Sequence, residues 1–239
     1  MTVLVVSGTG TEIGKTVVTA AVAAVARAAG RSVAVLKPAQ TGVGPGERGD
    51  ADEVVRLAGD GVTPVELVRF PEPLAPATAA RRAGMAPVAP EEVARAARKL
   101  AEEHDLVLVE GAGGLLVRYD AEGGTLADAA RLLDAPVLVV APAALGTLNM
   151  ATLTGEALRA RGLAQLGVVV GSWPDEPGLA ERCNITDLPE SAGAPLLGAV
   201  PAGAGALPVE AFRERAASWL APTLGGTWDA EAFAAAVRC

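Results

Sequence analysis

A glycine-rich stretch that ends in Lys-Thr is the strongest chemical signal in this chain. It reads GTGTEIGKT from Gly8 to Thr16, after a short β-branched run and at the start of an alanine-rich stretch that suits a helix. Small residues let backbone N–H groups converge on phosphate oxygens, and the amino end of a helix adds positive potential. Lys15 can then reach the terminal phosphates of a nucleotide, and the Thr16 hydroxyl can bind magnesium. A glycine-rich turn that binds nothing is the weaker interpretation, because Lys-Thr stands where a phosphate loop needs it.

The loop departs from the standard phosphate-loop pattern in one respect. That pattern places glycine five positions before Gly14, where this chain has Thr9, and the leading glycine lies one residue earlier, at Gly8. Chromosome-partitioning ATPases share such a variant loop, but they carry a signature lysine at the position that is Gly10 here. A partitioning or positioning ATPase that acts as a nucleotide switch is therefore the alternative function, and the missing lysine counts against it.

Two further polar groups follow apolar runs. Glu110 follows the run Leu106 to Val109 and precedes a glycine loop, whereas Lys37 follows the run Val33 to Leu36. Ligands of doubly wound sheets collect at the carboxyl ends of strands. A carboxylate there can hold the hard cation that bridges ATP phosphates, although it can also cap the next helix or turn. Lysines at strand ends are often simply solvated, so Lys37 taken alone favours that interpretation.

A glycine-rich segment, Val43 to Gly49, separates Lys37 from a pair of acids. The segment carries little to bury, so we expect a mobile loop. Asp50 or Asp52 could add a ligand to the magnesium ion, and an N-cap for the helix before Leu57 explains one of them equally well.

Six apolar runs and the stretches between them predict the elements that must position these groups. Continuous apolar runs suit strands that are covered on both faces, and parallel pairing requires crossover helices. The predicted strands are Thr2 to Val6, Ser32 to Leu36, Leu106 to Val109, Val137 to Ala141, Leu166 to Val170 and Leu196 to Val200. The predicted helices are Lys15 to Ala29, Glu91 to Glu103, Leu148 to Arg161 and Pro208 to Leu220, with a further short helix within Trp228 to Cys239. We expect an α/β fold, a doubly wound and mostly parallel sheet with helices on both faces, formed by residues 1–239 as one domain.

Composition narrows the functional classes. The net charge of −8 opposes a nucleic-acid partner, because a phosphate backbone requires a dense face of Lys and Arg. The apolar runs are far shorter than the roughly 20 residues of a membrane helix, and the amino terminus lacks a basic leader, so we expect a cytoplasmic protein without a membrane partner. Cys183 and Cys239 have no spacing for a metal or a redox pair, which fits a reducing cytoplasm, and we expect both to be inert. His104, the only histidine, is expected at the surface rather than in a catalytic role.

Taken in order, these motifs resemble those of the dethiobiotin synthetases, which use ATP to close the ureido ring of the biotin precursor. The similarity covers nearly the whole chain. Beyond the phosphate loop it includes Lys37-Pro38, Thr41-Gly42, Phe70 to Pro76, Val109 to Gly114, Leu145 to Asn149 and Pro195 to Gly198. It implies an ATP-dependent cyclo-ligase with a P-loop NTPase-like fold, with ATP or another nucleoside triphosphate and Mg²⁺ as cofactors. The implied substrates are diaminopelargonate and CO₂, and the implied reaction runs through a carbamate and a carbamic-phosphoric anhydride.

The resemblance also implies roles for individual residues. Lys37 and Lys15 would be catalytic, and magnesium would be bound by Thr16, Asp50 and Glu110. The nucleotide would be held by Glu12, Ile13, Gly14, Lys15, Thr16, Val17, Asp50, Glu110, Gly111, Ala112, Gly113, Pro201, Ala202 and Gly203. Gly171 and Ser172 would lie beside the base where many members have Asn-Asp, and which nucleobase is preferred stays open. Trp173 either packs in the core or stacks near that base.

The substrate site would be shared between two subunits. Thr11, Lys37 and Thr41 would contact the diamine in one subunit. In the dimer that the resemblance implies, the residues that reach across to bind the substrate carboxylate would be Gly146, Thr147, Leu148 and Asn149. We therefore expect a homodimer with its substrate site at the interface.

Overall fold

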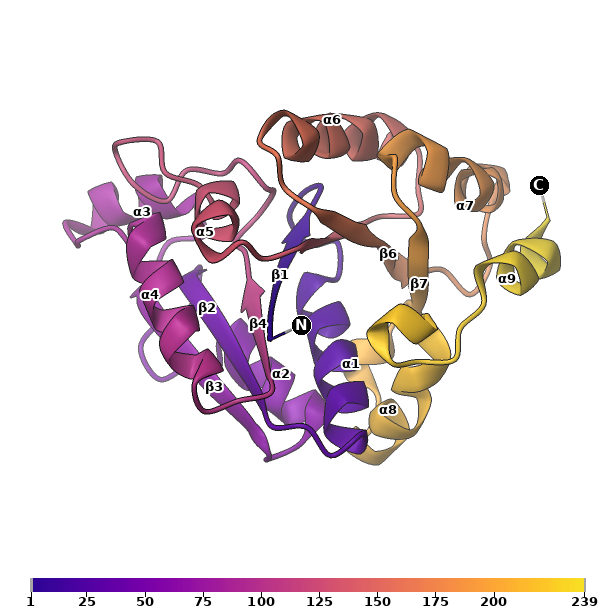
Figure 1. Cartoon of the computed structure of the whole chain (residues 1–239), viewed down its shortest axis with the longest axis horizontal. Helices are drawn as coiled ribbons and strands as arrows, with labels where there is room; N and C mark the ends of the chain where they lie inside the picture. The colour runs from indigo at the N-terminus through magenta and orange to yellow at the C-terminus, as the bar shows by residue number, and fades with distance from the viewer. Residues whose placement is uncertain (1, 239) are drawn as a thin grey trace.

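Seven strands form one sheet in the computed structural model, which describes residues 2–238 (Figure 1). Their order is β3-β2-β4-β1-β5-β6-β7, and each neighbouring pair is parallel. The strands are β1 (Val3–Gly8), β2 (Val33–Thr41), β3 (Val62–Phe70), β4 (Leu106–Glu110), β5 (Val137–Ala141), β6 (Gln165–Trp173) and β7 (Leu196–Pro201). Because all strands run in the same direction, their carboxyl ends meet at one edge of the sheet.

Helices cover both faces of the sheet and bury its Val-rich and Leu-rich strands. The helices are α1 (Lys15–Ala28), α2 (Asp50–Ala58), α3 (Pro76–Ala83), α4 (Pro90–Ala101), α5 (Leu126–Leu133), α6 (Thr147–Ala160), α7 (Leu179–Ala192), α8 (Val209–Ala216) and α9 (Ala230–Val237). α1, α2 and α8 pack against one another, whereas α4 packs with α5 and α6 with α7 on the other side (Figure 1). The predicted doubly wound α/β fold is confirmed.

The six predicted strands all form, but the sequence missed β3 and the length of β2. β3 is an edge strand in which only Val62 and Phe70 are buried, so it lacks the continuous apolar run that marks the central strands. β2 continues five residues beyond Leu36, because its second half pairs with β3 after its pairing with β4 has ended. Lys37 and Thr41 therefore lie within a strand rather than after it.

The predicted helices correspond to α1, α4, α6 and α8, and the short carboxyl-terminal one to α9. α8 ends at Ala216 rather than Leu220, since Ala217–Trp219 forms a 3₁₀ turn. The bounds of α2, α3, α5 and α7 were not predicted. The Pro-rich sequence around residues 70–76, expected from its prolines to be irregular, has regular structure at both ends: Phe70 ends β3, Pro76 begins α3, and residues 71–75 between them are irregular.

Three smaller expectations concern surface and compartment. His104 is half-buried at the amino end of β4, where its Nε2 lies 2.9 Å from Thr63 Oγ1. Cys183 in α7 is disulfide-bonded, which the cysteine spacing did not predict, so this spacing says nothing about the compartment. The expectation for Cys239 lies outside the described residues.

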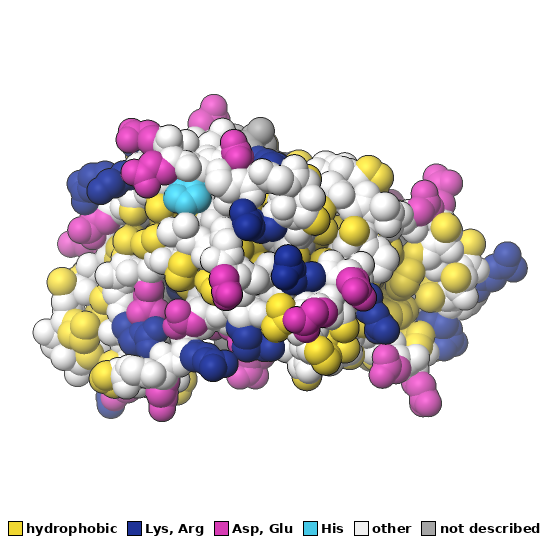
Figure 2. All heavy atoms as spheres, turned by 90° about the horizontal axis from the view of Figure 1, so that it is seen from below, with side chains coloured by type: hydrophobic (Ala, Val, Ile, Leu, Met, Phe, Trp, Pro, Cys, Tyr) yellow, Lys and Arg dark blue, Asp and Glu magenta, His cyan; other side chains and the backbone are white. Residues whose placement is uncertain are grey.

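Between residues 2 and 238, every helix is too short or too polar to span a membrane. Figure 2 shows acidic and basic side chains interspersed over one face of the described chain.

Candidate active site

The phosphate loop connects β1 to α1 and packs against the end of β6. Gly14, which precedes α1, has a φ of 90°, a left-handed conformation that side chains rarely adopt. A Cβ atom added to Gly14 would lie 2.2 Å from the carbonyl oxygen of Gly171, and one added to Gly171 would lie 2.0 Å from that of Ile13. Both positions require glycine because two backbones meet there, and β6 therefore supports the loop.

Lys15 is the first residue of α1 and folds back over the loop. Its Nζ donates to the carbonyl oxygen of Gly10 at 2.7 Å. Burial and the neighbouring Lys37 ammonium lower the pKa of Lys15 to about 8, while Glu110 and Asp50 compensate in part. A bound triphosphate would supply the negative charge that favours the protonated form of Lys15.

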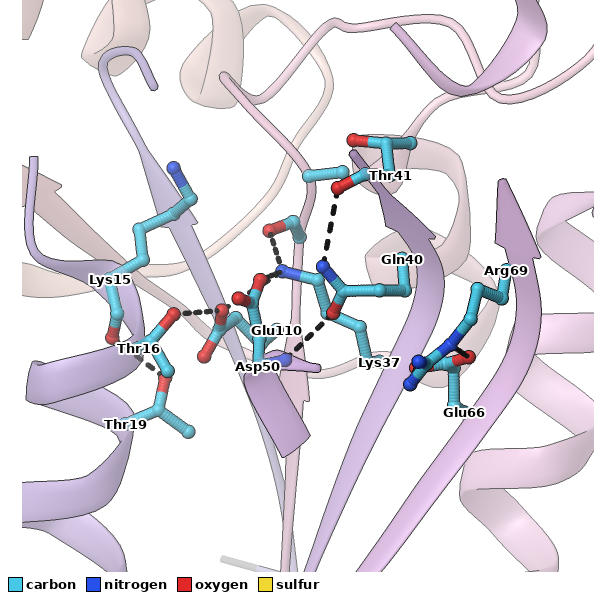
Figure 3. A network of polar contacts seen from close by, with 12 residues as sticks. Lys15, Thr16, Thr19, Lys37, Gln40, Thr41, Asp50, Glu66, Arg69 and Glu110 are labelled. Atoms are coloured by element: carbon cyan, nitrogen blue, oxygen red, sulfur yellow. Dashed lines mark hydrogen bonds and ion pairs between the residues drawn. The ribbon is translucent and has the colours of Figure 1, made fainter. Parts of the chain in front are cut away.

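Lys37 and Glu110 lie side by side because of the sheet register. Leu36 and Val109 form the last pair between β2 and β4, so the next residue of each strand projects at the carboxyl edge. Lys37 Nζ donates to Glu110 Oε1 at 2.9 Å and to the Gly111 carbonyl oxygen at 3.2 Å (Figure 3). Since 3% of Lys37 and 1% of Glu110 is exposed, neither is a solvated strand-end group.

Thr16 and Asp50 complete this polar cluster. Thr16 Oγ1 donates to Glu110 Oε1 at 2.8 Å, and Asp50 forms an ion pair with Lys37 (Figure 3). Burial by itself would lower the pKa of Lys37, but the carboxylates of Glu110 and Asp50 outweigh it and raise the pKa above its ordinary value. Lys37 therefore keeps its positive charge, and four elements (α1, β2, α2 and β4) each contribute one side chain to the cluster.

The two acids after the glycine-rich segment have different surroundings. Asp50, the first residue of α2, faces the cavity beside Lys37. Asp52, the third residue of α2, instead accepts at its Oδ2 from the backbone N–H of the N-cap residue Gly49 at 3.0 Å, as in a capping box. Neither acid is the N-cap that the sequence allowed, because Gly49 occupies that position; Asp52 supports the helix start from within the first turn, while Asp50 is the acid that lies in the candidate site.

A cavity of about 670 Å³ opens beside the cluster at the carboxyl edge of the sheet. The expected site residues that line it are Thr11, Glu12, Ile13, Gly14, Lys15, Thr16, Val17, Lys37, Thr41, Asp50, Glu110, Ala112 and Gly113. Gln40, Val43, Leu74, Ala75 and Val117 also line it and were not assigned from the sequence. Leu74 and Ala75 fall within the stretch Phe70 to Pro76 that carried part of the family resemblance, Gln40 lies between Lys37-Pro38 and Thr41-Gly42, and nothing in the sequence marked Val117.

The other expected nucleotide contacts lie near the same edge but do not line this cavity. They are Gly111, Gly171, Ser172, Pro201, Ala202 and Gly203. The backbone N–H of Ala202 donates to the carbonyl oxygen of Trp173 at 2.6 Å, which joins the ends of β7 and β6. Trp173 is 9% exposed and its ring centroid lies 5.2 Å from that of Phe233 in α9. Of the two roles considered for Trp173, packing is the one observed.

The segment expected to bind the substrate carboxylate lies outside the cavity of its own chain. Thr147 begins α6, is 1% exposed, and its Oγ1 has no hydrogen-bond partner within residues 2–238. Gly146 and Asn149 are exposed, and Leu148 is half-buried. Any polar contact from this segment to a second subunit would therefore come from backbone groups or from Asn149, because the Thr147 side chain is covered.

The oxygen donors around the cavity suit a magnesium ion. Thr16 offers a hydroxyl, and Asp50 and Glu110 offer carboxylates, which are the hard ligands that Mg²⁺ prefers. Glu110 Oε2 is buried without a hydrogen-bond partner in the described part of the chain, so one oxygen is available to a cation. Residues 2–238 contain no group of three or more His, Cys, Asp or Glu side chains arranged for a metal.

The strand order and the phosphate loop at the start of α1 define a P-loop nucleotide-binding protein. A family model described as an AAA domain matches residues 2–205. The structure resembles that of a ParA family ATPase from Chlorobium tepidum TLS with a TM-score of 0.57 and 14% sequence identity, over 94% of this chain and 96% of that one. A likeness at this level of identity shows the fold alone.

Closer relatives identify the family. The chain is 73% identical over 236 residues to the ATP-dependent dethiobiotin synthetase BioD of Streptomyces avermitilis, which covers 99% of each chain. It is 71% identical over 233 residues to the protein of the same name from Streptomyces coelicolor, which covers 98% of each. The chain belongs to the dethiobiotin synthetase family and is an ATP-dependent ligase, so the predicted family is confirmed.

Proposed function

We propose that this protein uses ATP to join CO₂ to the two amines of diaminopelargonate and so closes a ureido ring. The observation that carries the proposal is the full-length identity of 73% to a dethiobiotin synthetase. The cavity supports it, because Lys15, Lys37 and two carboxylates gather where a triphosphate and a small substrate would meet. The proposed product is dethiobiotin, with ADP and phosphate released.

The reaction proceeds in three steps. One substrate amine attacks CO₂ and loses a proton, which gives a carbamate. A carbamate oxygen then attacks the γ-phosphorus of ATP, the bond to the β-phosphate oxygen breaks, and ADP leaves. The second amine attacks the carbonyl carbon of the resulting carbamic-phosphoric anhydride, loses a proton and expels phosphate, which closes the ring.

Charge is the main obstacle, since a carbamate must approach a triphosphate. Lys37 keeps its ammonium form within the cavity, and Lys15 stands at the start of α1, so both can neutralise charge that develops on the transferred phosphoryl group. Thr16, Asp50 and Glu110 would hold Mg²⁺, which would shield phosphate charge when bound. Thr11 and Thr41 line the same cavity and would orient the diamine.

The nucleobase would lie beyond the phosphate loop, near the ends of β6 and β7. Gly171, Ser172, Pro201, Ala202 and Gly203 are at that corner. Gly171 has no side chain, and its packing against Ile13 leaves no room for one. Backbone groups of these residues would therefore form most of the contacts to the base, and Gly111, Ala112 and Gly113 would approach the phosphates.

A homodimer would complete the substrate site. Leu145, Met150 and Leu153 are exposed large apolar side chains in or beside α6, close to Gly146 and Asn149. Burial of such side chains against a second subunit would be favourable. The same contact would bring the exposed amino end of α6 toward the partner's cavity, where it could bind the substrate carboxylate.

A direct assay tests the proposed reaction. The purified protein is incubated with ATP, Mg²⁺, bicarbonate and diaminopelargonate, and dethiobiotin and ADP are quantified by mass spectrometry. We expect one dethiobiotin per ADP, and no product when any component is omitted. Lys15→Ala should bind ATP much more weakly than the parent protein. ATP hydrolysis that ignores the diamine and yields no dethiobiotin would contradict the proposal and favour the nucleotide-switch alternative.

A further inference from the structure

One arginine from the edge strand holds the glycine-rich segment between β2 and α2. Arg69 Nη1 donates to the carbonyl oxygens of Gly44 at 3.1 Å and Glu47 at 2.5 Å. Its Nε and Nη2 donate to the two carboxylate oxygens of Glu66 at 2.7 and 2.8 Å (Figure 3). This bidentate pair fixes the plane of the guanidinium, so the remaining nitrogen has a defined direction toward the segment. The expected mobile loop is thus tied to β3 at two of its carbonyl groups.

Gln40 ties the far end of the same segment to β2. Gln40 is 3% exposed, and its Oε1 accepts from the backbone N–H of Asp50 at 2.7 Å (Figure 3). Its Nε2 donates to the carbonyl oxygen of Thr41 at 3.3 Å. A buried amide with both ends occupied has little freedom. The first residue of α2 is therefore held by a side chain from the strand that carries Lys37.

Gly49 shows how closely these groups converge. Its φ of −92° and ψ of −179° are extended values that any residue adopts, so backbone conformation does not explain the glycine. A Cβ atom at this position would lie 2.9 Å from Arg69 Nη2, from Gln40 Oε1 and from Glu66 Oε2. Glycine is required at this position because three polar side chains meet immediately before Asp50 and leave no room for a Cβ atom.

Asp50 depends on this support more than its partners in the cluster do. Glu110 is buried within the central strand β4, and Thr16 lies in the first turn of α1. Asp50 instead follows a segment with glycine at positions 42, 44, 46 and 49, and its side chain is 37% exposed. Without external contacts, the backbone entropy of such a segment would spread the Asp50 carboxylate over many positions.

We propose that Glu66, Arg69 and Gln40 are positioning residues that hold the Asp50 carboxylate in the cavity and thereby set the affinity for the divalent cation. Glu66 and Arg69 do not line the cavity, and in this role all three residues act through Asp50. The proposal rests on the proposed function for the assignment of Asp50 as a ligand. Outer contacts that orient a metal ligand typically change metal affinity or activity by about 10-fold to 100-fold when removed.

Manganese binding gives a readout that does not require turnover. Mn²⁺ replaces Mg²⁺, and free Mn²⁺ is measured by electron paramagnetic resonance in the presence of the protein and saturating ADP. We expect Arg69→Ala to weaken Mn²⁺ binding about 10-fold, while ADP binding measured with EDTA changes less than about twofold. Arg69→Lys should bind Mn²⁺ with an affinity between those of the parent protein and Arg69→Ala, because an ammonium group can donate to a backbone carbonyl but cannot form the bidentate pair with Glu66.

Control variants separate positioning from general damage. Arg95→Ala removes an exposed arginine in α4 that also pairs with a glutamate three residues away, at 3.8 Å, and should leave Mn²⁺ affinity unchanged. Glu66→Gln and Gly49→Ala disturb the same contacts independently, so they serve if Arg69→Ala fails to fold. Parental Mn²⁺ affinity in folded Arg69→Ala or Glu66→Gln would overturn the proposal, as would an equal loss of metal-free ADP binding. A parent protein that makes no dethiobiotin would instead contradict the proposed function, whatever the metal titration gives.

Discussion

At the scale of single residues, the environment of Lys37 indicates a catalytic role most directly. It carries a positive charge between Glu110 and Asp50, at the bottom of a cavity large enough for a triphosphate tail and a small substrate. We expect Lys37→Gln to bind ATP within about threefold of the parent and to lose turnover by about 100-fold, since its amide keeps a donor toward Glu110 but has no charge for the phosphoryl group. Steady-state kinetics and ATP titration measure the two quantities.

Lys37→Ala is the harsher form of the same test. It leaves Glu110 buried without its cation, so its melting temperature must be recorded before its kinetics are compared with those of Lys37→Gln. Turnover at the parental rate in either folded variant would refute a catalytic role for Lys37.

The pH dependence of folding stability can be tested at a single residue, Asp105. Its Oδ2 accepts from the backbone N–H and from the hydroxyl of Ser32, both at 2.9 Å, which links the starts of β4 and β2. These hydrogen bonds hold the pKa of the Asp105 carboxyl below its ordinary value of 3.8. The carboxylate therefore stabilises the folded state fully above pH 3.8, and this contribution is lost as the pH falls through the lower, folded-state pKa.

Asp105→Asn should accordingly melt below the parent at pH 7, and the difference should shrink as the solution is acidified below pH 3.8. Melting curves across this range check it. Ser32→Ala removes the hydroxyl contact from the other side and should show the same trend in weaker form. A constant difference at all pH values would mean that the Asp105 charge is not involved.

Much of the site could be predicted at this scale because its residue types are chemically demanding. Lys15, Thr16 and Glu110 stand in motifs whose spacing reflects phosphate and metal geometry. Gln40 and Arg69 were not predicted, because they contact the segment before Asp50 and the Asp50 backbone rather than a ligand. Amide or guanidinium groups on a strand do not by themselves indicate such partners.

At the scale of elements, the junction between the phosphate loop and β6 is a tightly constrained contact. Gly171→Ala would push a methyl group to 2.0 Å from the Ile13 carbonyl oxygen, so the loop or the strand must move. We expect a loss of stability of about 1 to 3 kcal/mol, typical of overpacking, together with weaker ATP binding. Thermal melts and nucleotide titration measure both effects.

Gly10→Ala is a matched change in the same loop for the stability comparison. A Cβ atom there meets no atom closer than 4.0 Å, so its melting temperature should stay near that of the parent. Equal melting temperatures for Gly171→Ala and the parent would show that the junction is looser than the described contacts indicate.

Elements differed in how far they could be predicted. The central strands were marked by continuous apolar runs, because both of their faces are covered. Only the two end residues of β3 are buried, and Pro64, Glu66 and Arg69 lie between them. The position of β3 in the sheet is therefore fixed by its pairing with β2 rather than by a hydrophobic pattern of its own. The same pairing lengthens β2, which no local signal in Lys37 to Thr41 revealed.

At the scale of the whole molecule, α6 and α8 lie on opposite sides of the sheet (Figure 1). Three of the large exposed apolar side chains, Leu145, Met150 and Leu153, are in or beside α6. Leu153 is 53% exposed on α6. If this face joins two subunits, Leu153→Glu should shift the mass measured by light scattering from dimer toward monomer and lower turnover at micromolar protein concentrations, because burial of a charge is costly.

Arg215→Glu on α8 changes charge on the other side of the sheet and should leave the mass unchanged. A parent protein that is monomeric at these concentrations would contradict the shared substrate site. The fold class itself was predictable at this scale, since alternating apolar runs and helical stretches of this length allow few arrangements other than a doubly wound sheet.

The chain's three tryptophans, Trp173, Trp219 and Trp228, are all buried toward its carboxyl-terminal third. Trp173 and Trp228 both contact Phe233, and Trp219 contacts Phe212. None of them lines the cavity that contains Lys37. Intrinsic fluorescence should therefore report on the docking of α9 and on events near the ends of β6 and β7, and remain nearly silent to changes confined to the phosphate end.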